Sequence, residues 1–164
     1  MTRIIKPFKV FTAVIGLGLL TTMVHDTAAQ TAGVLASAQY SADPDLRCDL
    51  LEVKRVSGGT LMIRWRIVNT AAAGGGLTAT GSKSIRYTFH WEDIYFIDPA
   101  ENKKYQFLTD SGGNRILDVF EGDLAAGAQR LNWARFPAPL ESSLKISFGI
   151  PKCSPPFDDI AISK

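Results

Sequence analysis

Histidine and cysteine are scarce in this chain of 164 residues, which contains two of each. The histidines are His25 and His90, so a hydrolase that needs an imidazole base has one candidate beyond the N-terminal segment. Two cysteines and one histidine are too few ligands for a protein zinc site. We therefore expect no catalytic site, no metal and no cofactor.

An excess of charge of one sign is missing as well. The chain has 18 basic and 16 acidic residues, and setting aside Arg3, Lys6, Lys9 and Asp26 leaves 15 of each. Domains that bind nucleic acids usually carry a clear basic excess on one face. The composition therefore predicts no nucleic-acid partner.

The first 29 residues have the three parts of an export signal. Basic residues precede an apolar run of 15 residues, Val10 to Val24, and Thr27-Ala28-Ala29 supplies the small side chains of a cleavage site. A permanent membrane helix needs about 20 apolar residues, so this run is short for one. We predict a cleaved signal peptide over residues 1–29, a periplasmic or secreted protein, and no stable membrane span after cleavage. Cleavage after Ala38 is the alternative.

Both cysteines, Cys48 and Cys153, lie beyond this signal. In an exported protein we expect them to form a disulfide, which would close a loop of about 105 residues. Two buried free thiols are the alternative. The 135 residues from 30 to 164 are enough for one domain.

Short alternating apolar patterns fill this domain, and no long helical period is present. The clearest pattern is Thr60 to Asn69, in which Leu61, Ile63, Trp65 and Ile67 alternate with Met62, Arg64, Arg66 and Val68. The other strand patterns cover residues 46–56, 84–91, 94–109 as a hairpin, 116–120, 129–136, 144–150 and 157–162. Their number and spacing predict an all-β antiparallel sandwich of seven or eight strands over residues 46–164. Residues 30–45 are predicted to be a flexible lead-in, and the Gly-rich segment 70–81 a loop of undetermined role.

Three short motifs resemble functional sequences, but each lacks its companions. Ser142 to Lys145 has the S-x-x-K spacing without the accompanying S-D-N and K-T-G motifs. Asp110-Ser111-Gly112-Gly113 resembles the nucleophile segment of chymotrypsin-like proteases, with His90 as the one available base. Residues 76–84 resemble a P-loop, but Ser82 separates the second glycine from Lys83. We interpret all three as structural.

Three further groups of residues are candidate binding sites, each with a simpler structural interpretation. Three arginines, Arg64, Arg66 and Arg86, form either a basic strip or the solvated side of a sheet. Four aromatic residues form either a platform on which sugars stack or part of the core, namely Trp91, Tyr95, Phe96 and Tyr105. Three carboxylates, Asp118, Glu121 and Asp123, form either a calcium site or an ordinary soluble loop. We favour the structural interpretation of each group and assign no binding residue.

The second half of the chain carries a recognisable order of short motifs. They are Trp91, Ile97-Asp98-Pro99, Lys104-Tyr105, Asp110-x-Gly112, Gly127, Trp133 to Pro139 and Pro155 to Ile160. This order resembles immunoglobulin-like β-sandwich domains of bacterial envelope proteins, which are largely uncharacterised and some of which lie beside OmpA-type peptidoglycan-binding domains. The resemblance covers about half of the chain. It implies the fold and an exported location, and it brings no catalytic residue and no ligand.

Fold, location and missing catalytic groups together favour a non-enzymatic binding module of the cell envelope. We expect a protein partner in the envelope, contacted through a sheet edge or a sheet face. A module that binds a small ligand or a glycan, peptidoglycan included, is the alternative, and a hydrolase that uses Ser111 and His90 is the third. The sequence does not determine the partner, the strand order or the oligomeric state.

Overall fold

The computed structural model describes residues 33–71, 84–88 and 90–164. Within these ranges the chain forms antiparallel β-sheets and one short 3-10 helix, η1 (Trp91–Asp93). The strands are β1 (Ala36–Tyr40), β2 (Leu46–Val56), β3 (Thr60–Asn69), β4 (Ile85–Tyr87), β5 (Tyr95–Asp98), β6 (Lys103–Gln106), β7 (Leu117–Asp118), β8 (Gly122–Leu124), β9 (Gln129–Pro137), β10 (Lys145–Gly149), β11 (Cys153–Ser154) and β12 (Phe157–Ala161). The predicted all-β antiparallel sandwich is confirmed, although the described residues form twelve strands because several strands are only two or three residues long.

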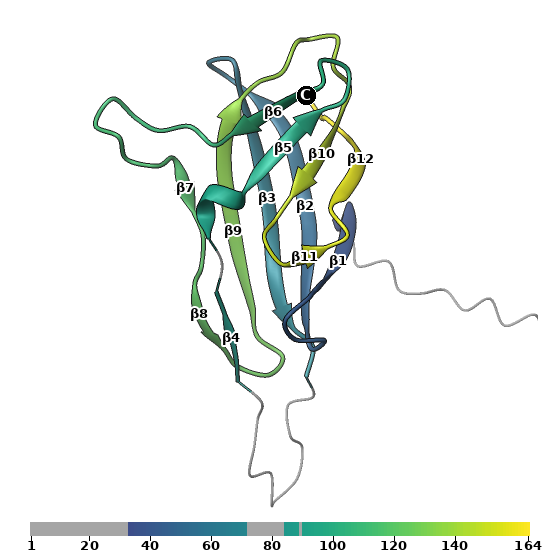
Figure 1. Ribbon diagram of the computed structural model, residues 1–164, viewed down its shortest axis with the longest axis vertical. Coiled ribbons are helices and arrows are strands. Elements are labelled where there is room, and N and C mark those ends of the chain that lie inside the picture. Colours follow the sequence, from purple (N-terminus) through teal and green to yellow (C-terminus); the bar gives the residue numbers. More distant parts are fainter. Residues whose placement is uncertain (1–32, 72–83, 89) are drawn as a thin grey trace, which may run out of the picture. The chain divides into compact units, whose positions relative to one another are not determined.

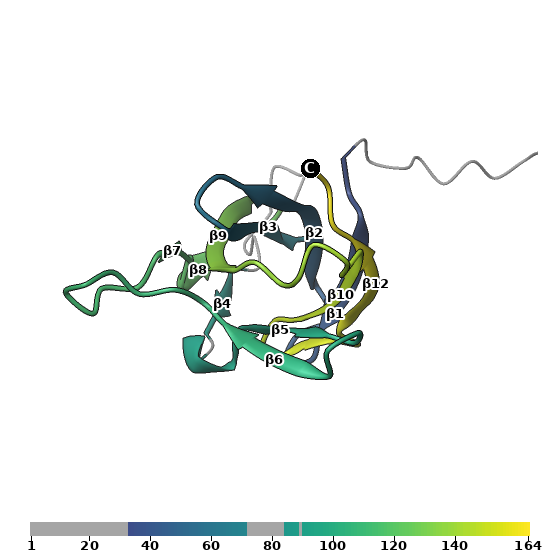
Figure 2. The same cartoon turned by 90° about the horizontal axis from the view of Figure 1, so that it is seen from above.

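The strands are arranged in two main sheets and one small sheet. The larger sheet has the order β11-β1-β2-β3-β9-β7, the second has the order β12-β10-β5-β6, and β4 pairs with β8. Figure 1 shows the long strands β2, β3 and β9 side by side. Figure 2, seen from above, places these three in one layer and β5, β6 and β10 in the other.

The core between the layers follows from the alternation along each strand. Leu61, Ile63, Trp65 and Ile67 of β3 are all fully buried, as the pattern predicts. They meet aromatic side chains of the second sheet, and the rings of Trp65 and Phe148 lie 5.5 Å apart. The side chains on the other face of β3, among them Arg64, are more exposed, so one face of this strand is buried in the core and the other is turned toward solvent, as predicted.

Hydrogen bonds join the two main sheets to each other on both sides. Beyond β12, the Ser163 N–H donates to the Val53 carbonyl on β2 at 2.9 Å. Beyond β6, the Leu108 N–H donates to the Arg135 carbonyl on β9 at 2.7 Å. Of the four outermost strands, β7 and β11 have two residues each, β6 carries Lys103 and Lys104, and β12 carries Asp158 and Asp159. Short edges and edge lysines both discourage the addition of a further strand.

Arg55, near the end of β2, holds the loop that connects β9 to β10. Its guanidinium donates to the carbonyl oxygens of Pro139 at 2.8 Å, Leu140 at 2.6 Å and Ser143 at 3.2 Å. The side chain is only 14 % exposed, so these bonds are largely shielded from water. One side chain therefore donates to three carbonyls of this loop, of which Leu140 also accepts the Ser143 N–H at 2.9 Å.

Residues 30–45 were predicted to be a flexible lead-in, and this does not hold for Ala36–Tyr40. These residues form β1, which pairs with β2 on one side and with β11 on the other. Ala38 and Tyr40 are buried, and the Ser37 hydroxyl donates to Asp49 at 2.7 Å. The small, weakly apolar side chains gave little pattern, and the pairing with two neighbouring strands is what orders the segment.

The predicted strand over residues 84–91 is shorter than expected. Ile85–Tyr87 forms β4, whereas Trp91–Asp93 turns into η1, where Glu92 and Asp93 break the alternation. Its partner, β8, lies in a segment predicted in part as a loop. The hairpin over 94–109 is confirmed as β5 and β6, and the tail forms β12 as predicted.

Two predicted features lie outside the described residues. They are the signal peptide over residues 1–29, and most of the Gly-rich segment 70–81 together with the P-loop-like motif.

Candidate binding surfaces

The predicted disulfide between Cys48 and Cys153 is present. The two Cα atoms lie 6.1 Å apart, and both side chains are buried. Cys48 belongs to β2 and Cys153 to β11, with β1 between these strands in the sheet. The bond therefore links the beginning and the end of the domain across one strand.

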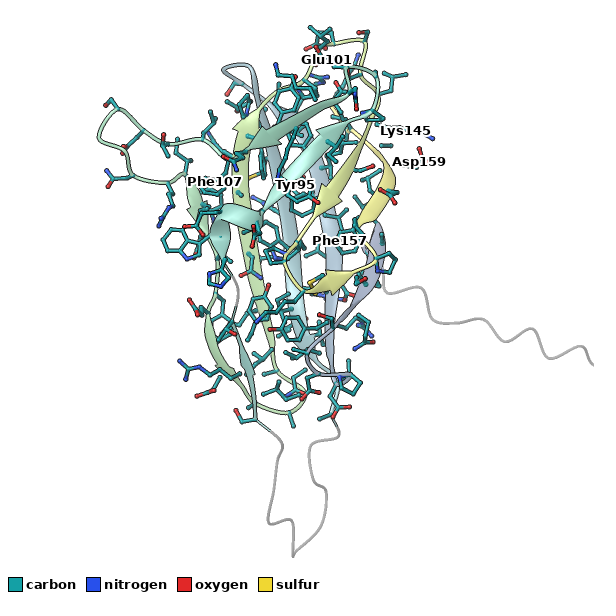
Figure 3. All side chains as sticks on the ribbon, viewed as in Figure 1. Tyr95, Glu101, Phe107, Lys145, Phe157 and Asp159 are labelled. Atoms are coloured by element: carbon teal, nitrogen blue, oxygen red, sulfur yellow. A yellow bond between two sulfur atoms is a disulfide. The ribbon has the colours of Figure 1, made fainter. Side chains whose placement is uncertain are left out.

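Within the S-x-x-K motif, Ser142 is exposed, whereas Ser143 and Lys145 make contacts with other parts of the fold. Ser143 is buried and donates its hydroxyl to Asp98 at 2.5 Å. Burial alone would raise the pKa of Asp98, but hydrogen bonds from Ser143 and from the Ala100 amide lower it overall. Lys145 lies 3.6 Å from the Asp159 carboxylate on β12, and both are labelled in Figure 3. Its ammonium is thus engaged in an ion pair between neighbouring strands.

The Asp110-Ser111-Gly112-Gly113 segment is a tight turn. One carboxylate oxygen of Asp110 accepts the N–H groups of Gly112 and Asn114, each at 2.8 Å. Hydrogen bonds from Asn114 lower the pKa of Asp110, and the bond from the Asn114 side chain has a larger effect than the bond from its backbone N–H. His90 is exposed, as predicted, and lines a depression to which Ser111 does not contribute.

The four candidate aromatics do not form one exposed platform. Phe96 and Tyr105 are buried and stack on each other with ring centroids 4.6 Å apart. The Tyr105 hydroxyl donates to Glu101 at 2.6 Å, and this bond with burial raises the Tyr105 pKa to about 12. The Arg115 guanidinium lies 3.0 Å from the Trp91 ring centroid, and the Lys104 ammonium lies 4.0 Å from that of Tyr95. One face of each of these two rings is therefore already covered by a cation.

The three candidate arginines do not form one strip. Arg64 and Arg66 share the outer face of β3, while Arg86 lies on β4, 3.9 Å from Asp123. Within the sheet, Arg64 lies 3.4 Å from Glu52 and Arg66 lies 2.9 Å from Asp49.

Asp49 is a fully buried carboxylate on this outer face. It accepts hydrogen bonds from Arg47 at 2.7 Å, from Arg66 at 2.9 Å and from Ser37 at 2.7 Å. Burial alone would raise the pKa of Asp49, but these three donors together more than offset burial and lower it. The network ties β1, β2 and β3 together on the outer side of the sheet.

The outer face continues onto β9 with two apolar side chains. Leu131 pairs with Arg66 and Trp133 pairs with Arg64, so all four lie on the same side of the sheet. Leu131 is 58 % exposed and Trp133 is half-buried, whereas Phe136, of opposite phase, is fully buried. We call Arg64, Arg66, Leu131 and Trp133 the outer-face patch.

A depression of about 310 Å³ opens at the other sheet, around the turn that follows β10. Four polar side chains from two segments line it: His90, Asp93 and Tyr95 around η1, and Lys152 after β10. The remaining walls include Ile150 and two prolines. Lys152 lies more than 50 positions after the other three, so only the fold brings these side chains together.

The candidate carboxylates Asp118, Glu121 and Asp123 are spread over different surroundings. Asp118 pairs with Trp133, Asp123 faces Arg86, and Glu121 lines a separate depression of about 120 Å³ beside Trp91. Over residues 33–71, 84–88 and 90–164, no three His, Cys, Asp or Glu side chains are grouped as a metal site would need.

In the described part of the chain, no helix has the length and apolar character needed to cross a bilayer. Comparisons of the chain with protein-family models, with curated proteins and with solved structures give no match. The resemblance to immunoglobulin-like envelope domains therefore stays a prediction.

Proposed function

We propose that the chain is a non-enzymatic binding module with an immunoglobulin-like fold, exported to the bacterial periplasm or beyond the cell. A protein of the envelope is its partner. The buried disulfide supports export, because such bonds persist in oxidising compartments. Lys145 forms an ion pair with Asp159 and Ser143 is hydrogen-bonded to Asp98, which supports a structural explanation of the S-x-x-K motif.

Signal cleavage after Ala29 fits this domain better than cleavage after Ala38. The second cut would divide β1 in its middle and remove Ser37, a donor to Asp49. We expect the exported protein to begin at Gln30, and an intact-mass measurement on material recovered from the periplasm or medium checks this. A mass that starts at Gln39 would contradict it.

The outer-face patch is the main reason for proposing that the partner binds to this face of the larger sheet. Tryptophan and arginine are the residues most enriched at binding hot spots, and here two arginines stand opposite an exposed leucine and a tryptophan. Each outermost strand of the two main sheets is two residues long or carries two charged side chains, which favours a face over an edge.

The charges around the patch indicate what kind of partner fits. The basic side chains on the outer face of β2, β3 and β9 are Arg47, Lys54, Arg64, Arg66 and Arg135. The acidic ones on β2 and β7 are Asp49, Glu52 and Asp118. A basic excess around an apolar centre is complementary to a protein surface with an apolar side chain ringed by carboxylates.

Site-specific photo-crosslinking in cells tests this proposal. A photoreactive residue replaces Leu131 in one strain and Leu144 in the control strain, since Leu144 is 72 % exposed on a different loop. We expect one recurrent envelope protein to be captured from position 131 and lost when Trp133→Ala is added, with an unchanged melting temperature. Equal capture from both positions, or no capture from position 131, would overturn the proposed docking face.

The non-enzymatic part of the proposal has its own test. Ser111→Ala combined with His90→Ala removes the nucleophile and base of the remaining hydrolase alternative. Hydrolysis of peptide or ester substrates that is present in the wild-type protein and absent from this double variant would refute a purely binding function.

A further inference from the structure

We propose that the depression beside the Ile150–Cys153 turn binds a small ligand that carries a carboxylate next to a hydroxyl or amino group. This inference goes beyond the proposed function, because it concerns the second sheet and uses none of the outer-face residues. The ligand chemistry has two sources, an amino acid or peptide end and a sugar acid.

The turn itself is the first observation. The Cys153 N–H donates to the Ile150 carbonyl at 3.1 Å, Pro151 occupies the second position and Lys152 the third, with φ at +62°. Turns with a positive φ at the third position strongly favour glycine or asparagine there. A lysine at such a position is strained, and strain of this kind is concentrated at functional sites.

The turn is held firmly from outside. The Ser41 N–H donates to the Lys152 carbonyl at 2.6 Å, and the next residue, Cys153, is fixed by the disulfide to β2. The Lys152 ammonium donates one of its three N–H groups to the Thr88 hydroxyl at 3.3 Å. The side chain thus begins from a fixed backbone, which lowers the entropy that ligand binding would cost.

Glycine at position 149 also shapes the depression. The ring of Tyr95 lies against Gly149 so closely that an added Cβ would be 2.9 Å from its Cζ. Figure 3 labels Tyr95 on the side of the second sheet that is turned toward the viewer. Glycine at position 149 therefore lets the ring lie across β10, in the wall of the depression.

The polar groups that line the depression have complementary chemistry. Lys152 supplies an ammonium for a carboxylate, and Asp93 supplies a carboxylate that accepts from a hydroxyl or an ammonium group. His90 and Tyr95 can each donate or accept a hydrogen bond. Ile150 and Pro151 give an apolar wall, and about 310 Å³ is within the range of small-ligand sites.

An NMR titration of the 15N-labelled, disulfide-bonded protein tests the proposal. The probes are alanine and alanyl-alanine, glucuronate, and two controls without a carboxylate, methyl glucoside and ethanolamine. We expect saturable shifts of the amides at 90–95 and 150–153 with at least one of the acids and none with the controls. Binding of the alanine compounds alone assigns the amino-acid source, binding of glucuronate alone the sugar acid, and binding of both a general carboxylate site.

Lys152→Gly is the decisive variant, because glycine suits a positive φ and therefore keeps or raises the melting temperature. We expect it to weaken binding about tenfold or more, since a charge-assisted hydrogen bond is lost. Lys145→Ala is the matched control, because Lys145 is also an exposed lysine and is expected to leave the affinity unchanged. Binding undiminished in Lys152→Gly, equal binding of methyl glucoside, or no saturable shift with either acid would overturn the proposal.

Discussion

Removal of the Cys48–Cys153 disulfide gives the largest single change in stability that we predict. The perturbation is the double variant Cys48→Ala with Cys153→Ala, because a serine hydroxyl at these buried positions would add its own desolvation cost. The bond joins residues 105 apart, and a crosslink over such a loop restricts the unfolded chain enough to stabilise the fold by about 4.7 kcal/mol.

That loss is large for a domain of this size. Thr31–Lys164 forms one compact unit, and typical stabilities per residue give about 7–20 kcal/mol for its length. With an unfolding entropy of about 2.1 cal/mol/K per residue, the melting temperature is expected to fall by about 15–20 °C. The variant should still fold at room temperature but lose a large part of its margin.

Guanidinium denaturation followed by tryptophan fluorescence measures the change, since Trp65 is fully buried in the core. Reduced wild-type protein is the control, because it keeps both sulfur atoms in place and lacks only the bond. We expect the two proteins to lose similar amounts of free energy. A loss below about 2 kcal/mol in both would be falsifying for the argument that the long loop is the source of the stabilisation.

Three further changes test other parts of the fold. Arg55→Ala should cost about 2 kcal/mol of unfolding free energy, because the Pro139 and Ser143 carbonyls lose their side-chain donor and Leu140 keeps only the Ser143 N–H. Arg55→Lys should cost less, since an ammonium can still bond some of these carbonyls although it cannot reach all three. Both are measured by urea denaturation, and equal losses would argue against a role for the guanidinium fork. Gly149→Ala should cost about 1–3 kcal/mol through the clash with Tyr95, and an unchanged melting temperature would refute the close contact. The pKa of Asp49 is lowered in the fold, so its contribution is present above about pH 4 and is lost as the pH falls through the folded pKa. Asp49→Asn should therefore destabilise by about 1–3 kcal/mol at pH 7, with a penalty that shrinks as the pH falls below about 4, and a penalty independent of pH would exclude the ionised carboxylate as its cause.

The parts of the fold that could be predicted are those with a strong local pattern. The alternation in Thr60 to Asn69 predicted β3 and its buried face, and the strand patterns over 94–109 predicted the hairpin of β5 and β6.

The parts that were missed depend on partners far away in the sequence. Ala36–Tyr40 has too little apolar alternation to be recognised alone, and it is ordered by pairing with β2 and β11. The depression at Lys152 had one local signal, a Pro-Lys pair directly before a disulfide cysteine. That signal becomes informative only when the positive φ of Lys152 is known, because a turn with that backbone would normally carry glycine.

The arrangement of β1 between β2 and β11 has a consequence for the order in which the chain can fold. Tyr40 pairs with Cys153, and Lys54 bridges to Ser163, so the pairing of the first two strands is completed only by the last dozen residues. A chain that emerges N-terminus first cannot complete the larger sheet until nearly all of it is available. Because Cys153 lies on β11, the disulfide to Cys48 can likewise form only at that late stage.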